Sequence, residues 1–404
     1  MHHKVLLGLF LCLCFISHSL AFDKTSKLAG SKLSFEKYTI SAPFKVSLPV
    51  IAIDIIENAD APYDELVVIG QDESNQTWLA VYSFDDKQNQ FSLVDKILLA
   101  NEYFAFDVSE DEETLYFLAK NKVVSLKYNL ENVKHNNSTV FSLEMNQTVN
   151  SIFLVNESSF IMEKDFIQDI NDDGKDDIIL ADFEKTNLWI SRKNSPENHY
   201  QHIAISAKVE LNRGDVTFKP TKLFLADFNL DNKQDIAWIT QGSVNFFSQK
   251  NDGTYAAEQQ KITIADTIYG LNWWEITESD GQGMDQSNLT HRVVEEIKDI
   301  NGDGLADVVV RYTKSSGVLD RANDYEFYFG FRTDENQLMY QEKANTVIKA
   351  DGTLTGLKII DVNEDKQFEV LLSSFELSVS NIIGALLSGG IDQNVLLFAL
   401  NNDS

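Results

Sequence analysis

The sequence predicts an all-β chain built from repeated sheets, and three observations support this prediction. A nine-residue pattern, Asp-x-Asn-x-Asp-x-x-x-acid, occurs four times, each time directly before a short run of apolar and β-branched residues. The copies begin at residues 169, 227, 299 and 361 and are therefore 58, 72 and 62 residues apart; such periods are typical of repeat proteins, including propellers. No Pro-rich or Gly/Ser-rich linker interrupts the chain, which has five prolines. Residues 22–404 are therefore predicted to form a single β-propeller domain.

Each repeat is predicted to contain four strands, the number in a propeller blade. The first strand leads into the motif, as in residues 222–226. The second strand follows the motif. The runs that begin at Asp177, Asp235, Asp307 and Glu369 are predicted to be strands because they are too short and too β-branched for helices. Third strands are predicted at residues 187–191, 244–248, 325–331 and 394–400. More polar fourth strands are predicted at residues 200–206, 255–264 and 339–348.

The same order of strands occurs in two earlier units, beginning near residues 54 and 107, so the repeat count predicts six blades. Seven blades are possible if residues 150–160, or the long insertion after Ile264, contain another unit. The last unit ends after its third strand, and residues 33–40 resemble a fourth. We expect this N-terminal strand to complete the C-terminal blade and close the ring, which protects sheet edges from aggregation.

The motif itself predicts calcium sites. Side-chain oxygens at positions 1, 3 and 5, the carbonyl of position 7 and the acid at position 9 supply the oxygen shell that Ca²⁺ prefers. An EF-hand is excluded because its loop needs a Glu at position 12, where this chain has residues of predicted strands. Up to four structural Ca²⁺ ions are predicted. The predicted ligands are Asp169, Asn171, Asp173, Lys175 and Asp177; Asp227, Asn229, Asp231, Lys233 and Asp235; Asp299, Asn301, Asp303, Leu305 and Asp307; and Asp361, Asn363, Asp365, Gln367 and Glu369.

The copies differ at position 6, where a tight turn favours a left-handed residue. Gly174 and Gly304 make the first and third copies the strongest, Asn232 comes next, and Lys366 makes the fourth copy the weakest. The alternative interpretation is a set of Asx turns without an ion. That alternative is preferred for the two early units, since Leu115 occupies position 9 in one, and the other has extra residues between Asp54 and its next polar residues.

The nine-residue loop ends in an acid that is also the first residue of a predicted strand. In this it resembles the calcium loops of the FG-GAP/VCBS repeat family, which includes the integrin α-chain propeller and many bacterial exported proteins. Four copies carry the resemblance strongly and two weakly, across nearly the whole chain after residue 21. The Phe-Gly and Gly-Ala-Pro elements of the family are not evident, so the bacterial branch fits better than an integrin. The resemblance implies a propeller whose calcium ions lie in turns between strands of the same blade.

Residues 1–21 read as a signal peptide, with a basic start, an apolar stretch and a small-residue cleavage site that ends at Ala21. We therefore expect export to the periplasm or the cell exterior, with no transmembrane segment. Both cysteines, Cys12 and Cys14, lie in this segment, so no disulfide is expected afterwards. The net charge of −28 argues against nucleic acid as a partner.

No motif in the sequence indicates a nucleophile, a general base or a redox cofactor. The sequence therefore favours a non-enzymatic module that binds a protein or a glycan. The partner candidates are Trp273 and Trp274, adjacent in a Gly-rich, acidic insertion, because such rings can stack on a sugar or anchor a protein. They could equally pack within the insertion. The alternative function is a propeller enzyme acting on polysaccharide, a lyase or a hydrolase, and a pure scaffold is a third possibility.

Overall fold

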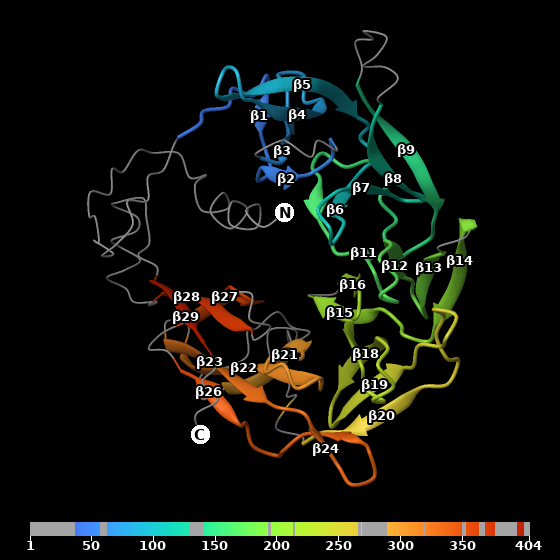
Figure 1. Ribbon diagram of the computed structural model, residues 1–404, viewed down its shortest axis with the longest axis vertical. Coiled ribbons are helices and arrows are strands. Elements are labelled where there is room, and N and C mark those ends of the chain that lie inside the picture. Colours follow the sequence, from blue (N-terminus) through green and yellow to red (C-terminus); the bar gives the residue numbers. More distant parts are fainter. Residues whose placement is uncertain are drawn as a thin grey trace. The chain divides into compact units, whose positions relative to one another are not determined.

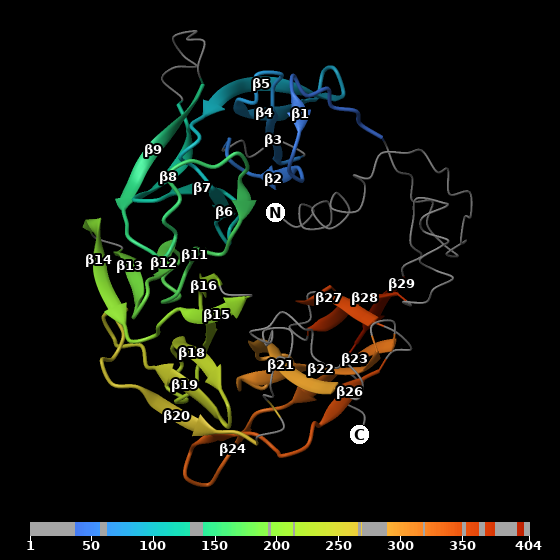
Figure 2. The ribbon, with the colours of Figure 1, turned by 180° about the vertical axis from the view of Figure 1, so that it is seen from behind.

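The computed structural model describes residues 37–56, 63–129, 140–192, 195–212, 215–265, 268, 289–317, 320–349, 353–362, 368–375 and 394–399. Every regular element in these ranges is a β-strand. The chain forms two compact units, one of residues 1–168 and 178–180 and one of residues 169–177 and 181–404. Figures 1 and 2 show the strands of both units from opposite sides.

The first unit contains two antiparallel sheets. The first has the order β1-β3-β4-β5, with β2 also paired to β3. Its strands are β1 (Lys45–Val46), β2 (Ile51–Ile53), β3 (Glu65–Gln71), β4 (Thr77–Asp85) and β5 (Gln90–Leu99). The second has the order β10-β6-β7-β8-β9, in which only the short β10 runs parallel to its neighbour. Its strands are β6 (Ala105–Val108), β7 (Leu115–Ala119), β8 (Lys122–Tyr128), β9 (Phe141–Thr148) and β10 (Met162–Glu163).

The division between the units falls within the strands of a third sheet, of order β11-β12-β13-β14. These strands are β11 (Ile167–Gln168), β12 (Asp177–Ala181), β13 (Thr186–Arg192) and β14 (Ser195–Ile203). A two-stranded hairpin that the sequence did not predict follows, formed by β15 (Lys208–Asn212) and β16 (Asp215–Lys219).

Three further sheets lie in the second unit. The fourth consists of β17 (Phe224–Ala226), β18 (Asp235–Thr240), β19 (Ser243–Phe247) and β20 (Gln260–Thr263). The fifth consists of β21 (Leu289–Lys298), β22 (Asp307–Gly317), β23 (Asp320–Tyr328) and β26 (Thr346–Ile348), with a small pair, β24 (Phe331–Arg332) and β25 (Leu338–Met339), beside it in sequence. The sixth consists of β27 (Thr353–Ile360), β28 (Glu369–Phe375) and β29 (Asn394–Phe398).

Six successive meander sheets of this kind are the blades of a β-propeller, so the predicted all-β propeller class and the count of six are confirmed. Residues 150–160, one place where a seventh unit was considered, contain no strand. The other place lies mostly outside the described residues. Closure of the ring remains a prediction: residues 37–40 form no strand, and Tyr38 packs edge-on against Phe84 and Phe91 of the first sheet.

The period-two alternation of side chains explains how the sheets of the second unit share their cores. Val308 and Val310 of β22 belong to one buried cluster together with Ala237 of β18. Val309, on the opposite face of β22, belongs to another cluster together with Val370 of β28. Both faces of β22 are therefore covered at its start, where three consecutive valines, Val308 to Val310, are buried.

Candidate metal sites

The four motif copies are named loops 1 to 4: Asp169–Asp177, Asp227–Asp235, Asp299–Asp307 and Asp361–Glu369. The acid at position 9 of each loop is also the first residue of a strand, namely β12, β18, β22 and β28. All four of these acids are buried. A buried carboxylate is costly unless it is hydrogen-bonded, so the hydrogen-bond donors around each of these acids decide whether its charge is stabilised.

Backbone N–H groups supply those partners. In loop 3, Asp307 accepts hydrogen bonds from the N–H of Ile300, at position 2, at 3.0 Å and from the N–H of Gly330, after β23, at 2.9 Å. The equivalent donors are Ile170 and Ser191 for Asp177, at 3.2 and 2.6 Å, and Phe228 and Gln249 for Asp235, at 3.2 and 3.0 Å. The acid therefore joins the start of its loop to the end of the third strand. Only glycine fits at residue 330, since a Cβ there would lie 2.6 Å from the carbonyl oxygen of Ala306.

The first half of each loop is closed by the aspartate at position 1. In loop 1, Asp169 accepts from the N–H of Asp173 at 3.1 Å and from that of Gly174 at 2.7 Å, and Asn171 also accepts from Asp173, at 3.1 Å. Loops 2 and 3 repeat all three bonds at 2.7–3.1 Å. In loop 2, Asp227 accepts from the N–H groups of Asp231 and Asn232, and Asn229 accepts from that of Asp231. In loop 3, Asp299 accepts from the N–H groups of Asp303 and Gly304, and Asn301 accepts from that of Asp303. The same turn is thus built three times.

Position 6 is left-handed in all three of these loops, as predicted, with φ values of 78° at Gly174, 63° at Asn232 and 82° at Gly304. Position 4 is left-handed too, which the sequence did not indicate. It is occupied by Asp172, Leu230 and Gly302, with φ values of 58°, 64° and 76°. Leu230 is an unfavourable residue for this conformation, so loop 2 contains strain that loop 3 avoids with glycine.

Burial is the main cause of raised pKa values at position 9. It raises the pKa of Asp177 and of Asp235 to about 7 and that of Asp307 to about 6, although the backbone donors act in the opposite direction. The carboxylates at positions 5 and 1 of the same loop raise these pKa values further. In loops 1 to 3 a cation would relieve the repulsion that the acids at positions 1 and 5 exert on the acid at position 9.

Loop 4 is described only at its ends. Glu369 accepts from the N–H of Val362 at 2.8 Å, which is the same position-2 contact as in the other loops. Val362, however, is 47% exposed, whereas Ile170, Phe228 and Ile300 are buried. The predicted ligands Asn363, Asp365 and Gln367 lie outside the described residues, so loop 4 shares the buried acid but not the buried position-2 side chain.

The donor chemistry of loops 1 to 3 fits a hard cation. Each offers two Asp carboxylates, an Asn oxygen, a main-chain carbonyl and a third Asp, which are the ligand types that Ca²⁺ takes. Carboxylate oxygens that accept one N–H retain further lone pairs. In the described residues no three His, Cys, Asp or Glu side chains are already drawn together as a metal group, so an ion would have to draw these oxygens inward. In loop 2 the ammonium of Lys233 lies 3.0 Å from Asp231.

A turn formed by residues 249–255, named the bridging turn, connects loops 1 and 2. The hydroxyl of the buried Tyr255 donates to the carbonyl oxygen of Ile170 at 2.5 Å, and it lies 3.5 Å from that of Gln234. Gly253, with a φ of 77°, lies against Asn171, since a Cβ there would be 3.0 Å from the Asn171 side-chain nitrogen. At its other end the turn provides the N–H of Gln249 to Asp235. Gln201 holds the main chain of Tyr255 through two hydrogen bonds, at 2.8 and 2.9 Å.

The sequence did not predict the roles of two residues, Tyr255 and Glu65. Tyr255 was assigned to a fourth strand, and the structure instead places it in the bridging turn before β20. In the first sheet, whose unit has extra residues after Asp54, the buried acid is Glu65, which accepts from the N–H of Ile56 at 3.0 Å. A signal for Glu65 was present, because it directly begins the apolar run of β3.

The remaining sequence predictions fall outside the described residues. Trp273 and Trp274 do so, as does the predicted signal peptide. Among the described residues no helix is long and apolar enough to cross a membrane.

Comparisons with known proteins give no family. No family model matches the chain, and no curated protein matches it. Among solved structures, the Pseudomonas aeruginosa periplasmic gluconolactonase is similar with 12% identity, 84% of this chain and 87% of that one covered, and a TM-score of 0.36. Kuenenia stuttgartiensis hydrazine synthase has 12% identity, coverages of 87% and 83% and a TM-score of 0.33. The WD40 domain of SCAP from fission yeast has 8% identity, coverage of 89% of both chains and a TM-score of 0.30.

Proposed function

We propose that this chain is an exported calcium-binding β-propeller that serves as an interaction module for a protein or a glycan. Its calcium is structural: the ions stabilise loops 1 to 4 and so hold the surfaces beside those loops in place. Asp169, Asp227, Asp299 and Asp361, at position 1, and the acids at position 9 would supply most of the charge that each ion neutralises.

One observation carries the calcium proposal. In loops 1, 2 and 3 the side chains at positions 1 and 3 accept the same three main-chain hydrogen bonds, and each loop ends in a buried acid with a raised pKa. A turn alone needs no third, buried acid, as the second sheet shows with Leu115 at the equivalent position. A bound divalent cation would explain the buried acid, because its positive charge would stabilise a carboxylate that is costly to bury.

Calorimetric titration of the chelator-treated protein with Ca²⁺ tests this proposal. We expect up to four sites, with dissociation constants of about 10⁻⁴–10⁻³ M, the range of extracellular calcium modules. Asp299→Asn keeps the acceptor for the N–H of Gly304 but removes a charge, so it should remove one site. Asp111→Asn, in the corresponding turn of the second sheet, is the matched control and should remove none. Absence of calcium binding to the unsubstituted protein would disprove the proposal.

The interaction role is supported by how the motif acids are used. The acids at positions 1 and 9 of loops 1 to 3 accept main-chain hydrogen bonds, which fits a structural role better than proton transfer to a substrate. Incubation with a panel of polysaccharides, followed by both binding and product analysis, tests it. Binding without cleavage supports the module, whereas bond cleavage would replace it by the alternative, a propeller enzyme acting on polysaccharide.

A further inference from the structure

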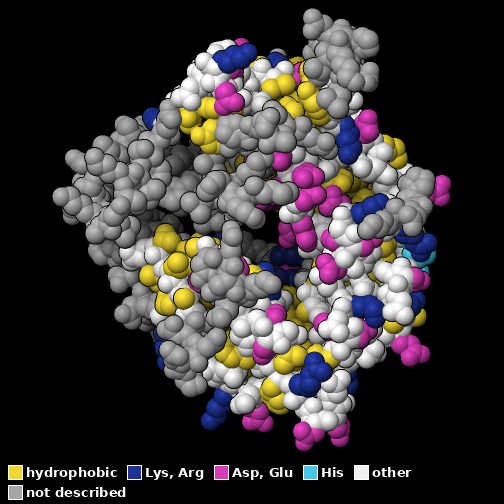
Figure 3. All heavy atoms as spheres, viewed as in Figure 1, with side chains coloured by type: hydrophobic (Ala, Val, Ile, Leu, Met, Phe, Trp, Pro, Cys, Tyr) yellow, Lys and Arg dark blue, Asp and Glu magenta, His cyan; other side chains and the backbone are white. Residues whose placement is uncertain are grey.

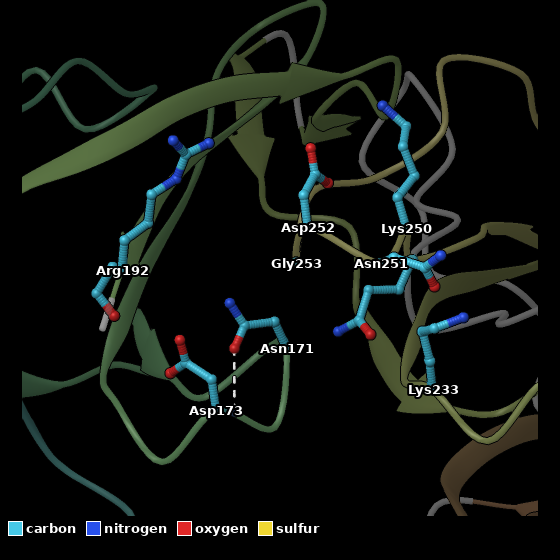
Figure 4. Close-up of a pocket in the computed structure, with 10 residues that line it drawn as sticks. Asn171, Asp173, Arg192, Lys233, Lys250, Asn251, Asp252 and Gly253 are labelled. Atoms are coloured by element: carbon cyan, nitrogen blue, oxygen red, sulfur yellow. Dashed lines mark hydrogen bonds between the residues drawn. The ribbon is translucent and has the colours of Figure 1, made fainter. Parts of the chain in front are cut away.

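A surface hollow of about 620 Å³ lies beside loop 1 and the bridging turn. This volume is within the range of small-molecule sites. All of its lining residues are polar, charged or glycine. Figure 4 shows Arg192 on one side and Lys250 with Asn251 on the other, with Asn171 and Asp173 of loop 1 between them. The lining therefore suits a hydrophilic ligand with many hydrogen-bonding groups rather than an apolar one.

Cations outnumber acids around this hollow. Arg192, Lys233 and Lys250 line it together with two acids, Asp173 and Asp252, although the whole chain has only 34 Lys and Arg against 62 Asp and Glu. Asp and Glu side chains are spread over the described surface in Figure 3, with Lys and Arg between them. Among the described residues neither Arg192 nor Lys250 forms an ion pair. A guanidinium and an ammonium on opposite sides can both donate charge-assisted hydrogen bonds to an anion.

Loop 1 decides whether an anion is tolerated there. Of its carboxylates, on Asp169, Asp173 and Asp177, that of Asp173 lines the hollow, and that of Asp177 accepts from the N–H of Ser191, which also lines it. Without an ion they repel an anion across a short distance, and a bound Ca²⁺ would neutralise two of their three charges. The sign of the local field therefore depends on the occupancy of loop 1.

The wall of the hollow also depends on both neighbouring loops. The bridging turn, which supplies Lys250 and Asn251, is attached to loop 1 through Tyr255 and Gly253 and to loop 2 through Gln249. An ion that orders the loops therefore also fixes the position of these side chains relative to Arg192.

We propose that this hollow binds the carboxylate of an acidic saccharide and does so only when loop 1 holds calcium. The inference rests on the proposed calcium sites and names the ligand class of the proposed module. Arg192 and Lys250 receive the carboxylate, and the amides and hydroxyl of Asn251, Gln249 and Ser191 face the sugar hydroxyls.

Calorimetry with trigalacturonic acid, compared with the neutral galactotriose, tests the proposal in a calcium buffer. Trigalacturonic acid should bind and galactotriose should not. The double variant Arg192→Ala/Lys250→Ala should weaken binding about tenfold or more, because two charge-assisted bonds are lost. Lys261→Ala, an exposed lysine of β20 outside the hollow, should leave the affinity unchanged. Equal binding by the double variant, or equal binding of galactotriose, would overturn the proposal.

The role of calcium needs its own control, since trigalacturonic acid itself can associate with Ca²⁺. Asp169→Asn, measured in the same calcium buffer, should lose saccharide binding because loop 1 no longer holds its ion; unchanged binding would overturn the dependence on loop 1. A hexaglutamate peptide that binds as well as trigalacturonic acid would overturn the saccharide assignment. If Ca²⁺ binds to the protein but trigalacturonic acid does not, only this inference fails; if Ca²⁺ does not bind, the proposed function fails.

Discussion

Loop 1 and the equivalent turn of the second sheet both begin with an aspartate, but the two carboxylates accept hydrogen bonds from different parts of the chain. In loop 1 both carboxylate oxygens of Asp169 accept from the loop's own main chain. In the second sheet one carboxylate oxygen of Asp107 instead accepts from the N–H groups of Phe166 and Ile167, at 2.7 and 2.8 Å. The turn there is closed by the hydroxyl of Ser109, which accepts from two main-chain N–H groups.

The comparison shows that one supersecondary unit can be closed in two ways. Where the terminal acid is present, as in loops 1 to 3, it is buried and accepts main-chain hydrogen bonds from its own loop and from the end of the third strand. Where it is replaced by the buried Leu115, the turn is closed by Ser109 and Asp111, and the position-1 acid accepts hydrogen bonds elsewhere. Glu65 in the first sheet is intermediate, since it keeps the buried acid and its contact with Ile56.

The largest effect is expected at position 9. Asp307→Ala should lower the free energy of unfolding by about 3 kcal/mol, because the N–H groups of Ile300 and Gly330 lose a charged acceptor. Asp307→Asn keeps an acceptor of the same shape and should cost less, yet should still remove calcium binding to loop 3. Urea denaturation and calcium titration of both variants measure the two roles separately. Equal stability of the alanine variant and the parent protein would contradict the assignment.

A pH effect of similar size is expected at Asp107. Burial raises its pKa to about 6 from 3.8, so the folded form binds the proton more tightly than the unfolded form. Its contribution therefore favours folding at low pH and is lost as the pH rises from about 4 to 6, by up to about 3 kcal/mol. Urea denaturation at several pH values should show this component in the parent protein and not in Asp107→Asn. Asp86→Asn, at an exposed turn, serves as the control and should retain it.

Calcium should stabilise the loops that have the terminal acid and should have no effect on the turn of the second sheet. At a tenfold excess over its dissociation constant, each occupied site should add about 1.4 kcal/mol to the stability. A chelator should therefore lower the melting temperature of the protein and increase its proteolysis. Asp299→Asn should reduce the response to calcium, whereas Ser109→Ala should lower the melting temperature without changing that response. An identical melting curve with and without chelator would remove the distinction between the loops.

The smallest effect is expected at position 6. Gly304 has a φ of 82° and a Cβ there would meet nothing within 4 Å, so Gly304→Ala changes only the backbone energy. We expect a loss of about 1 kcal/mol, measured as a shift of the urea midpoint. Gly304→Asn should recover part of this loss, because Asn tolerates the left-handed conformation and occupies position 6 in loop 2. A neutral alanine substitution would contradict the argument.

Much of the fold could be predicted because its information is local. An apolar run directly after the motif acid predicted β12, β18, β22 and β28 with the correct first residue in each case, since alternation and β-branching act within a few residues. The hairpin β15–β16 and the parallel contact of β10 were not predicted. Both depend on partners that adjacent sequence does not identify.

The sequence by itself determined the strand that follows each motif acid and the count of six blades, because each depends on residue types at short, fixed spacings. Only the tertiary structure decided where the buried acids find their donors, why Asp107 turns away from its own loop, and how Tyr255 joins loops 1 and 2. These contacts join residues such as Tyr255 and Ile170, 85 positions apart. Their geometry follows from how the strands pack, because a hydrogen bond requires its two atoms to be brought within about 3 Å.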